Sequence, residues 1–423
     1  MQYALNERIS ELDSQLASLL KRYSHTDEYQ KQKSIVLFDD MNEIKSNAEK
    51  LEEKMKTVKP SNEYEELILR EMNRNIDFLK YNIKEVVKNS KSKPSEVIKF
   101  YDLQQEDLDY LERWLENNQG NVKKALEEDL SLSEKDKSFE INLFKLKDRQ
   151  QMEEIIKRYH KVLGNTISKK LGIDFSSVSC EPTLDIREYG LYRSSPIKHI
   201  SINAEKLLRR YSGNIKPVPE ELISVYGHEG MGHAAHDIVS ETLPFKILDW
   251  ETDLNWSIAQ KESVAQHFEP KLFETLAESG DWKKLRIDNF SEVQSRYNTL
   301  KTITDFILKR NQYAVYVSSS EDMQPEEKIE KINKVSLNPK QAWKYTRHGW
   351  IDEKGDLENY DLIKNVLLFS ARPVEHALSR ISQNLGENFC KENEDKVNRF
   401  LLEGVWTNKG FLEKTDLFIK ENK

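Results

Sequence analysis

The sequence predicts a mainly α fold with one small antiparallel β-sheet, and three observations lead to this prediction. Only 14 glycines and 11 prolines occur among 423 residues, about half the usual share, which argues against an all-β fold with its frequent turns. Charged residues make up 33% of the chain, and Lys and Glu are interspersed as on solvated helix faces. Near the N-terminus, apolar residues such as Ile9, Leu12 and Leu16 recur at helical spacing.

Residues 1–140 are expected to form an N-terminal helical region that packs on or covers the rest of the chain. The expected helices are a first amphipathic segment, Glu28–Val58 before Pro60, a helix with Ser61 as its N-cap, Asp107–Asn117 and Val122–Leu130. Apolar heptads are not sustained here, so a coiled-coil partner surface is the weaker alternative. Nothing in this region has the pattern of a chemical site.

Residues 141–423 are expected to form a second helical domain, with a small sheet at about residues 173–203. A helix over Phe144–Lys170 should end at Gly172. The strands expected after it are Phe175–Cys180, Leu184–Tyr189 and Ile197–Ile202, which are partly β-branched and separated by Pro182, Gly190 and Pro196. The rest of the chain is expected to be helical, apart from one further strand at Tyr313–Val317.

Composition argues against several classes of protein. The net charge is −8 and no basic stripe is present, so a general nucleic-acid binder is not expected. Cys180 and Cys390 are the only cysteines, which excludes a disulfide scaffold and favours a reducing cytoplasm. No run of 18 apolar residues occurs, and the N-terminus lacks an apolar signal segment, so no membrane partner and no secretion are expected.

The segment from Pro219 to about residue 240 reads as a helix that carries a cluster of histidines. Pro219 suits the first helical position, and Glu220 and Glu221 suit the positive end of the helix dipole. Three of the nine histidines in the chain follow, namely His228, His233 and His236, with Glu229 and Asp237 each directly after a histidine. Such a cluster indicates a metal site, whereas the alternative is a helix with ordinary polar histidines.

The spacing of His228 and His233 predicts an irregular helix. Two histidines four residues apart share one face, but residues five apart diverge by about 140° on a regular helix. For both to bind one ion, the extra residue must be absorbed by a π-type bulge. Gly230 and Gly232 lie between the histidines and tolerate unusual backbone angles, so the wide turn is expected there. A pair of His233 with His236 is the alternative.

A zinc ion needs a third protein ligand, with a water in the open fourth position. The segment Asn255–Glu269 reads as a helix that ends against Pro270, and Glu262 lies on it, 29 residues after His233. That length of chain allows the first helix to end and a second to return, so Glu262 is the expected third ligand of one Zn²⁺ per chain. The rival carboxylates are Glu241, Glu251 and Glu269.

These motifs resemble those of the gluzincins, zinc peptidases with two His ligands and one Glu ligand. The segment from His228 to His236 resembles the HExGHAxH segment of the thimet-oligopeptidase-like metallopeptidases with one residue inserted. The inserted form, HExxGH, resembles the zinc helix of dipeptidyl peptidase III. The run from Glu262 to Glu269 is similar to the third-ligand helix of the oligopeptidases. The resemblance covers roughly residues 185–270 and implies a helical zinc peptidase.

Several residues are then expected to take part in hydrolysis. Glu229 is the expected general base, which takes a proton from the zinc-activated water and delivers it to the leaving amine. His236, Asp237 and Glu269 are candidates for orienting the ligands, with a purely structural role open for His236 and Asp237. The resemblance implies a Tyr or His that stabilises the tetrahedral intermediate, and the candidates are Tyr345, His348 and His376. Arg347, Arg372 and Arg380 are candidates for clamping a peptide carboxylate.

The leading functional hypothesis is therefore a cytoplasmic zinc peptidase whose partner is a short peptide substrate. The strand over Ile197–Asn203 is expected at a sheet edge, where it would pair with the extended peptide. Tyr189 and Tyr192 are candidates for reaching the cleft. The alternatives are a zinc hydrolase of a non-peptide amide and a non-catalytic helical interaction protein. Endo-, amino- or carboxy-directed cleavage and the oligomeric state stay open.

Overall fold

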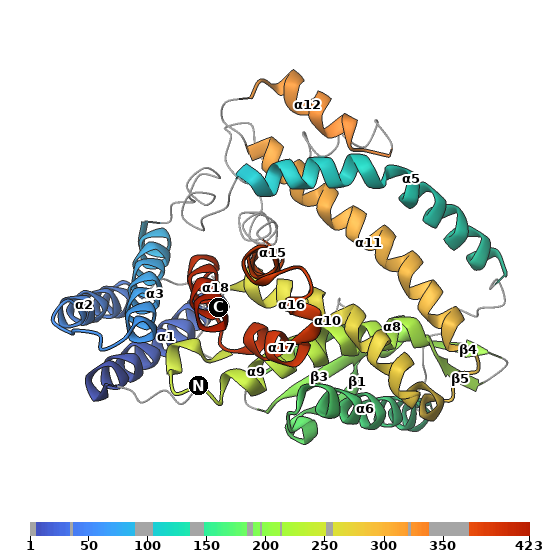
Figure 1. Ribbon diagram of the computed structural model, residues 1–423, viewed down its shortest axis with the longest axis horizontal. Coiled ribbons are helices and arrows are strands. Elements are labelled where there is room, and N and C mark those ends of the chain that lie inside the picture. The colour runs from blue at the N-terminus through green and yellow to red at the C-terminus, as the bar shows by residue number, and fades with distance from the viewer. Residues whose placement is uncertain are drawn as a thin grey trace.

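The computed structural model confirms a mainly α fold with two small sheets, of three and two strands. It describes residues 6–33, 37–88, 105–135, 148–183, 189–194, 197–211, 214–250, 257–319, 323–337 and 372–423. Figure 1 shows the N-terminal helices at the left, a long helical pair at the upper right, and the sheets below that pair. No helix within the described ranges has the length and apolar character needed to span a bilayer.

Three helices that contact one another form the N-terminal bundle. They are α1 (Glu7–Lys33), α2 (Phe38–Met55) and α3 (Glu63–Lys88). The single helix expected over Glu28–Val58 is wrong, because α1 and α2 fold back so that their apolar faces pack together. The N-cap expected at Ser61 is Asn62 instead, whose side chain accepts a hydrogen bond from the backbone of Glu65.

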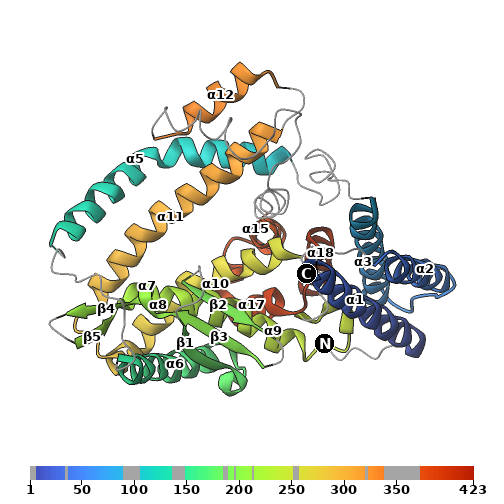
Figure 2. The same cartoon turned by 180° about the vertical axis from the view of Figure 1, so that it is seen from behind.

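A second structural unit consists of α5 (Gln105–Lys135) packed along α11 (Phe290–Ser319), with α12 (Pro325–Lys334) beside them (Figures 1 and 2). The two helices expected over Asp107–Leu130 are one helix that continues through Gly120. The strand expected at Tyr313–Val317 is also wrong. Its residues are buried in α11, where contact with α5 outweighs their β propensity.

The three-stranded sheet contains β1 (Ser179–Thr183), β2 (Gly190–Arg193) and β3 (His199–Asn203) in the order β1-β3-β2. The β3 strand is parallel to β1 and antiparallel to β2, so the sheet is mixed rather than antiparallel. The expectation that β3 lies at an edge is wrong, because β3 pairs with β1 on one side and with β2 on the other, which leaves β2 as an edge strand. Phe175–Ser177 forms a 3₁₀ turn instead of strand, capped by Asp174.

Along the chain, the two sheets follow one long helix, and the histidine segment and a second long helix follow the sheets. The α6 helix (Arg149–Leu171) packs on β1 and ends at Gly172 with φ of 65°, as expected. A hairpin of β4 (Leu208–Tyr211) and β5 (Asn214–Pro217) follows the first sheet. The α10 helix (Ile258–Ser279) then crosses the histidine segment.

The α10 helix continues through Pro270, which corrects the expected end before this residue. A proline inside a helix costs about 3 kcal/mol. Phe268, Leu272 and Phe273 are buried on either side of it, and burying each such side chain contributes about 1.5–3 kcal/mol. Packing on both sides of the proline therefore holds the helix together.

The C-terminal helices connect the N-terminal bundle to α10. They are α15 (Pro373–Leu385), α16 (Phe389–Glu392), α17 (Glu394–Leu402) and α18 (Asn408–Asn422). The α18 helix contacts both α3 and α15 (Figure 1). The expected domain boundary near residue 140 lies outside the described residues, and the division into 1–140 and 141–423 stays a prediction.

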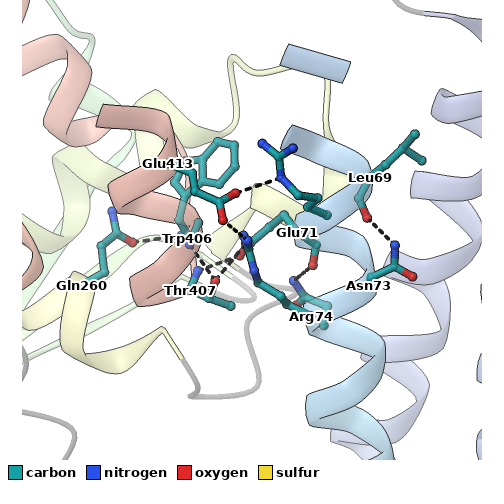
Figure 3. A network of polar contacts seen from close by, with 11 residues as sticks. Leu69, Glu71, Asn73, Arg74, Gln260, Trp406, Thr407 and Glu413 are labelled. Carbon is teal, nitrogen blue, oxygen red and sulfur yellow. Dashed lines mark hydrogen bonds and ion pairs between the residues drawn. The ribbon is translucent and has the colours of Figure 1, made fainter. Parts of the chain in front are cut away.

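A buried carboxylate fixes this connection (Figure 3). Glu71 of α3 is fully buried and accepts hydrogen bonds from the backbone and hydroxyl of Thr407, at 2.6 and 2.8 Å. Arg74 lies 3.0 Å from the same carboxylate and also pairs with Glu413 of α18. Next along the chain, the backbone N–H of Trp406 donates to Gln260 of α10 at 3.0 Å. Polar contacts thus run from the bundle to α10.

We predict that Glu71→Ala lowers the free energy of unfolding by about 3–5 kcal/mol, because it leaves Arg74 and the Thr407 donors without their buried partner. Chemical denaturation followed by circular dichroism measures the change. Glu66→Ala on the same helix is the matched control, since Glu66 forms an exposed ion pair with Arg70 and should cost less than about 1 kcal/mol. Equal effects of the two substitutions would contradict this role of Glu71.

Candidate metal centre

The histidine segment contains the wide turn that its spacing predicts. A regular helix over Pro219–Val225 (α8) is followed by π-helix over Tyr226–Ala234 and by regular helix again over Ala235–Ser240 (α9). The π-helical segment contains both His228 and His233. As a result, the two rings lie on one side, with their centroids 4.8 Å apart and their planes perpendicular.

The glycines of this segment have a different role from the one expected. Neither Gly230 nor Gly232 has a positive φ, so unusual backbone angles do not explain them. A Cβ on Gly232 would lie 2.5 Å from the Cα of Ala265 in α10, and a Cβ on Gly227 would lie 2.6 Å from the carbonyl oxygen of Glu269. The glycines therefore let α10 approach the π-helical segment closely.

This approach brings the three expected ligands together. The Nε2 atoms of His228 and His233 each lie 3.3 Å from a different carboxylate oxygen of Glu262. One donor atom from each residue lies within 4.8 Å of the others. Two imidazoles and one carboxylate form the donor set that zinc takes in many hydrolases, so the residues present fit a zinc ion.

The electrostatics of the cluster couple the two histidines to the carboxylates beside them. Burial alone would raise the pKa of Glu262, yet the facing rings of His233 and His228 hold it well below its usual range. Burial opposes the charged form of His228, but its contacts with Glu262 and Glu269 hold the pKa of this ring well above its usual value. The carboxylates therefore stay ionised here and favour positive charge between them.

The rival ligands occupy other places. Glu269 lies behind His228, with Oε2 3.8 Å from Nδ1 of the ring and Oε1 accepting a hydrogen bond from Ser224 at 2.6 Å. This is the place expected of a carboxylate that orients a ligand. Glu241 pairs with Lys198 at the far end of α9, and Glu251 lies outside the described residues.

His236 has a structural role behind the ligands. Its Nε2 donates to the carbonyl oxygen of Gly404 at 2.9 Å, and Gln260 of α10 donates to the same oxygen at 3.3 Å. Full burial lowers the pKa of His236 to about 3, so its ring is neutral. The Gly404 carbonyl thus connects α9, which follows His233, to α10, which carries Glu262.

Asp237 holds the edge strand β2 against the histidine helix. Its Oδ2 accepts hydrogen bonds from the hydroxyl groups of Tyr192 and Ser194, the latter at 2.8 Å, and lies 3.6 Å from Lys198. Because its contacts go to strand residues, Asp237 positions the strand and does not orient a ligand. The Tyr192 hydroxyl is occupied by this bond, but Tyr192 itself lines the large cavity, so the prediction that it reaches the cleft is confirmed.

Glu229 lies between the ligands and β2. It directly follows His228, and its Oε2 accepts a hydrogen bond from the backbone N–H of Tyr192 at 2.9 Å. This bond fixes the carboxylate at the wall of the cavity that His228 and His233 also line. The expected base is therefore next to the expected ligands.

The ligands face a cavity of about 700 Å³. Its walls are β2, α8, the π-helical segment, α10 and α11. Trp250, Tyr297 and Lys301 line it but have no motif in the sequence that identifies them, because they come from segments outside the histidine helix. Trp250 contacts the His233 ring with centroids 5.3 Å apart. Tyr189 also lines the cavity, so its expected place is correct.

The C-terminal candidates are not brought to the ligands. Tyr345, His348 and Arg347 lie outside the described residues. The His376 Nε2 lies 2.8 Å from Asp107 of α5, and His376 is not among the residues that line the cavity. Its neighbourhood is the contact between α15 and α5.

The two described arginine candidates already have acidic partners. Arg372 stacks on the ring of Tyr110 at 3.3 Å and pairs with Asp107 and Glu375. Arg380 pairs with the exposed Asp416. Neither guanidinium is therefore positioned to bind the carboxylate of a peptide.

Comparisons with known proteins support the fold but do not identify a family. No protein-family model matches the sequence, and no curated protein sequence matches it. A crystal structure of a "putative lipoprotein" from Colwellia psychrerythraea is similar, with a TM-score of 0.51 and 11% identity, covering 89% of this chain and 66% of that chain. This chain therefore spans about two thirds of its neighbour, and at this identity the likeness concerns the fold alone.

We predict that Gly232→Ala weakens zinc binding by about 10-fold or more, because the added methyl group pushes α10 and Glu262 away from the histidines. Zinc titration by calorimetry measures the affinity. Gly120→Ala in α5 is the matched control, since nothing lies within 4 Å of its Cβ position, and it should stabilise its helix slightly. Unchanged zinc affinity in Gly232→Ala would show that the close approach is not required.

Proposed function

We propose that this protein is a zinc-dependent peptidase that acts on short peptides. The observation that carries the proposal is the convergence of His228, His233 and Glu262 within 4.8 Å on the wall of a large cavity, next to Glu229. The resemblance of the two motifs to those of gluzincin peptidases supports it. The carboxylate of Glu269 beside His228 supports it as well, because histidines that bind a metal commonly donate their other ring N–H to a carboxylate.

Each residue has a distinct task in this proposal. His228, His233 and Glu262 would hold a zinc ion, which would lower the pKa of a bound water to near neutral and polarise the substrate carbonyl. Glu229 accepts a proton from that water and transfers it to the leaving amine. The backbone N–H of Tyr192 holds the Glu229 carboxylate in place, which keeps it aligned during both transfers.

The form of the cavity favours an extended peptide over a compact substrate. The β2 strand is an edge strand of its sheet, and its residues Gly190–Tyr192 line the cavity together with the preceding Tyr189. An edge strand binds an extended main chain through backbone hydrogen bonds, without selecting side chains. The cavity volume of about 700 Å³ lies within the range of about 300–1,000 Å³ that is usual for small-ligand sites. A short peptide therefore suits this site.

The first test concerns the metal. Purified protein should bind one zinc ion per chain, and zinc at about 100 times its dissociation constant should stabilise the fold by about 2.7 kcal/mol. His228→Ala should lose both effects, whereas His25→Ala, an exposed histidine of α1, should keep them. Elemental analysis and thermal unfolding measure the outcome. A wild-type protein that takes up no zinc would contradict the proposed function.

The second test separates chemistry from metal binding. Glu229→Gln should keep zinc but reduce hydrolysis of a mixed peptide library at least about 100-fold, because an amide cannot accept the proton. Glu274→Gln, an exposed position on α10, should leave hydrolysis unchanged. Mass spectrometry of the library follows cleavage. Near-native cleavage by Glu229→Gln would remove Glu229 as the base, and cleavage of non-peptide amides alone would redirect the proposal.

A further inference from the structure

Trp250 lies against a candidate metal ligand and against the elements around it. Its ring contacts the rings of His233 and His236 edge-to-face, with centroid distances of 5.3 and 5.6 Å. The ring of Tyr192 in β2 meets it at 5.8 Å, and the ammonium group of Lys261 in α10 lies 4.1 Å from its centroid. The ring distances fall in the range of favourable aromatic pairs, about 4.5–7 Å. One indole therefore connects β2, the histidine helix and α10.

The two histidines of the candidate metal centre are held in different ways. The Nε2 atom of each ring faces Glu262, which leaves Nδ1 for a second partner, commonly a carboxylate or carbonyl oxygen. For His228, this partner is the carboxylate of Glu269. The Nδ1 atom of His233 is buried, and within the part of the chain that the structure describes it has no hydrogen-bond partner. Packing against the rings of Trp250 and His228 takes the place of that bond.

The chain just before Trp250 is anchored by the N-terminal bundle. Lys246–Leu248 forms a short 3₁₀ turn. The carboxylate of Asp13 in α1, which is buried, accepts hydrogen bonds from the backbone N–H groups of Lys246 and Ile247, at 2.6 and 3.0 Å. A residue of another helix thus satisfies donors at the start of the turn. Because Trp250 follows the turn by two residues, this anchor limits where the indole can lie.

We propose that the N-terminal bundle supports the candidate metal centre through Trp250. Asp13 holds the turn, the turn presents the indole to His233, and the indole keeps the Nε2 atom of His233 opposite Glu262, 3.3 Å away. Trp250 and Asp13 are therefore positioning residues, and neither is a ligand. The inference rests on the proposed function, because it concerns the same metal centre, and it gives the bundle a task beyond packing.

Zinc affinity tests the first step, from Trp250 to His233. Trp250→Leu should weaken zinc binding by about 10-fold or more, the usual effect of removing a residue that orients a ligand. Trp250→Phe keeps an aromatic edge and should retain most of the affinity. Trp282→Leu is the matched control, since Trp282 stacks on Phe290 and is not among the residues that line the cavity. Competition with a coloured chelator measures the affinity.

A spectroscopic signature separates the orientation of the ligand from general stability. The visible absorption of protein loaded with Co²⁺ instead of Zn²⁺ depends on the geometry of the ligands. This spectrum should change in Trp250→Leu and should stay the same in Trp282→Leu and Trp250→Phe. Circular dichroism at the same temperature checks that each variant is folded.

A double-mutant cycle tests the second step, from Asp13 to Trp250. Asp13→Asn keeps the size of the side chain but removes one of the two acceptors, and it should weaken zinc binding by about 3-fold to 10-fold. Glu11→Gln removes the same charge at an exposed position of the same helix and should have no effect. In a protein that already carries Trp250→Leu, Asp13→Asn should cause little further loss, because the effects of residues that act through one another do not add.

The outcomes distinguish this inference from the proposed function. If the unmodified protein binds zinc and Trp250→Leu binds it equally well, the inference is overturned and the metal centre stands. Equal losses in Trp250→Leu and Trp282→Leu, or fully additive losses in the cycle, overturn it too. If Trp250→Leu does not fold, Asp13→Asn decides, and unchanged zinc affinity in that variant again overturns the inference. An unmodified protein that takes up no zinc contradicts the proposed function as well.

Discussion

The close contact between the π-helical segment and α10 is the constraint on which the candidate site depends. Gly227 and Gly232 allow the backbones of the two helices to meet, with positions that a methyl group could not occupy. Because of this approach, the carboxylate of Glu262 reaches both histidine rings at 3.3 Å, and that of Glu269 reaches the back of His228. The π-helical turn thus places the two histidines on one side. The glycines let α10 come close enough for Glu262 to reach them.

Residues far from the cavity hold this contact in place. The carbonyl of Gly404 accepts from His236 and from Gln260, so one peptide group ties the two ligand-bearing helices together. Gly404 has φ of 82°, a conformation that favours glycine. Two residues further on, Trp406 and Thr407 connect Gln260 to the buried Glu71 (Figure 3). The N-terminal bundle is therefore joined to the ligand helices by polar contacts.

The fold could be predicted where local patterns decide it and not where distant contacts do. Composition predicts the mainly α class. Local residues predict the end of α6 at Gly172 and the start of a helix at Pro219. Local patterns did not predict three other features. These are the break between α1 and α2, the continuation of α10 through Pro270 and the helical state of Tyr313–Val317. In each of these cases, packing against another helix outweighs the local preference. The position of β3 within its sheet likewise depends on a crossing connection that no local pattern records.

The sequence by itself predicted the irregular turn of the histidine helix, because His228 and His233 are five residues apart and a regular helix would separate them. Only the tertiary structure brought Glu262 within 3.3 Å of both histidine rings, placed Glu229 against the backbone of Tyr192, and gave His236 and Asp237 structural contacts. These pairs are distant in sequence, and their meeting depends on how closely whole helices pack, which glycines such as Gly232 permit but do not by themselves reveal.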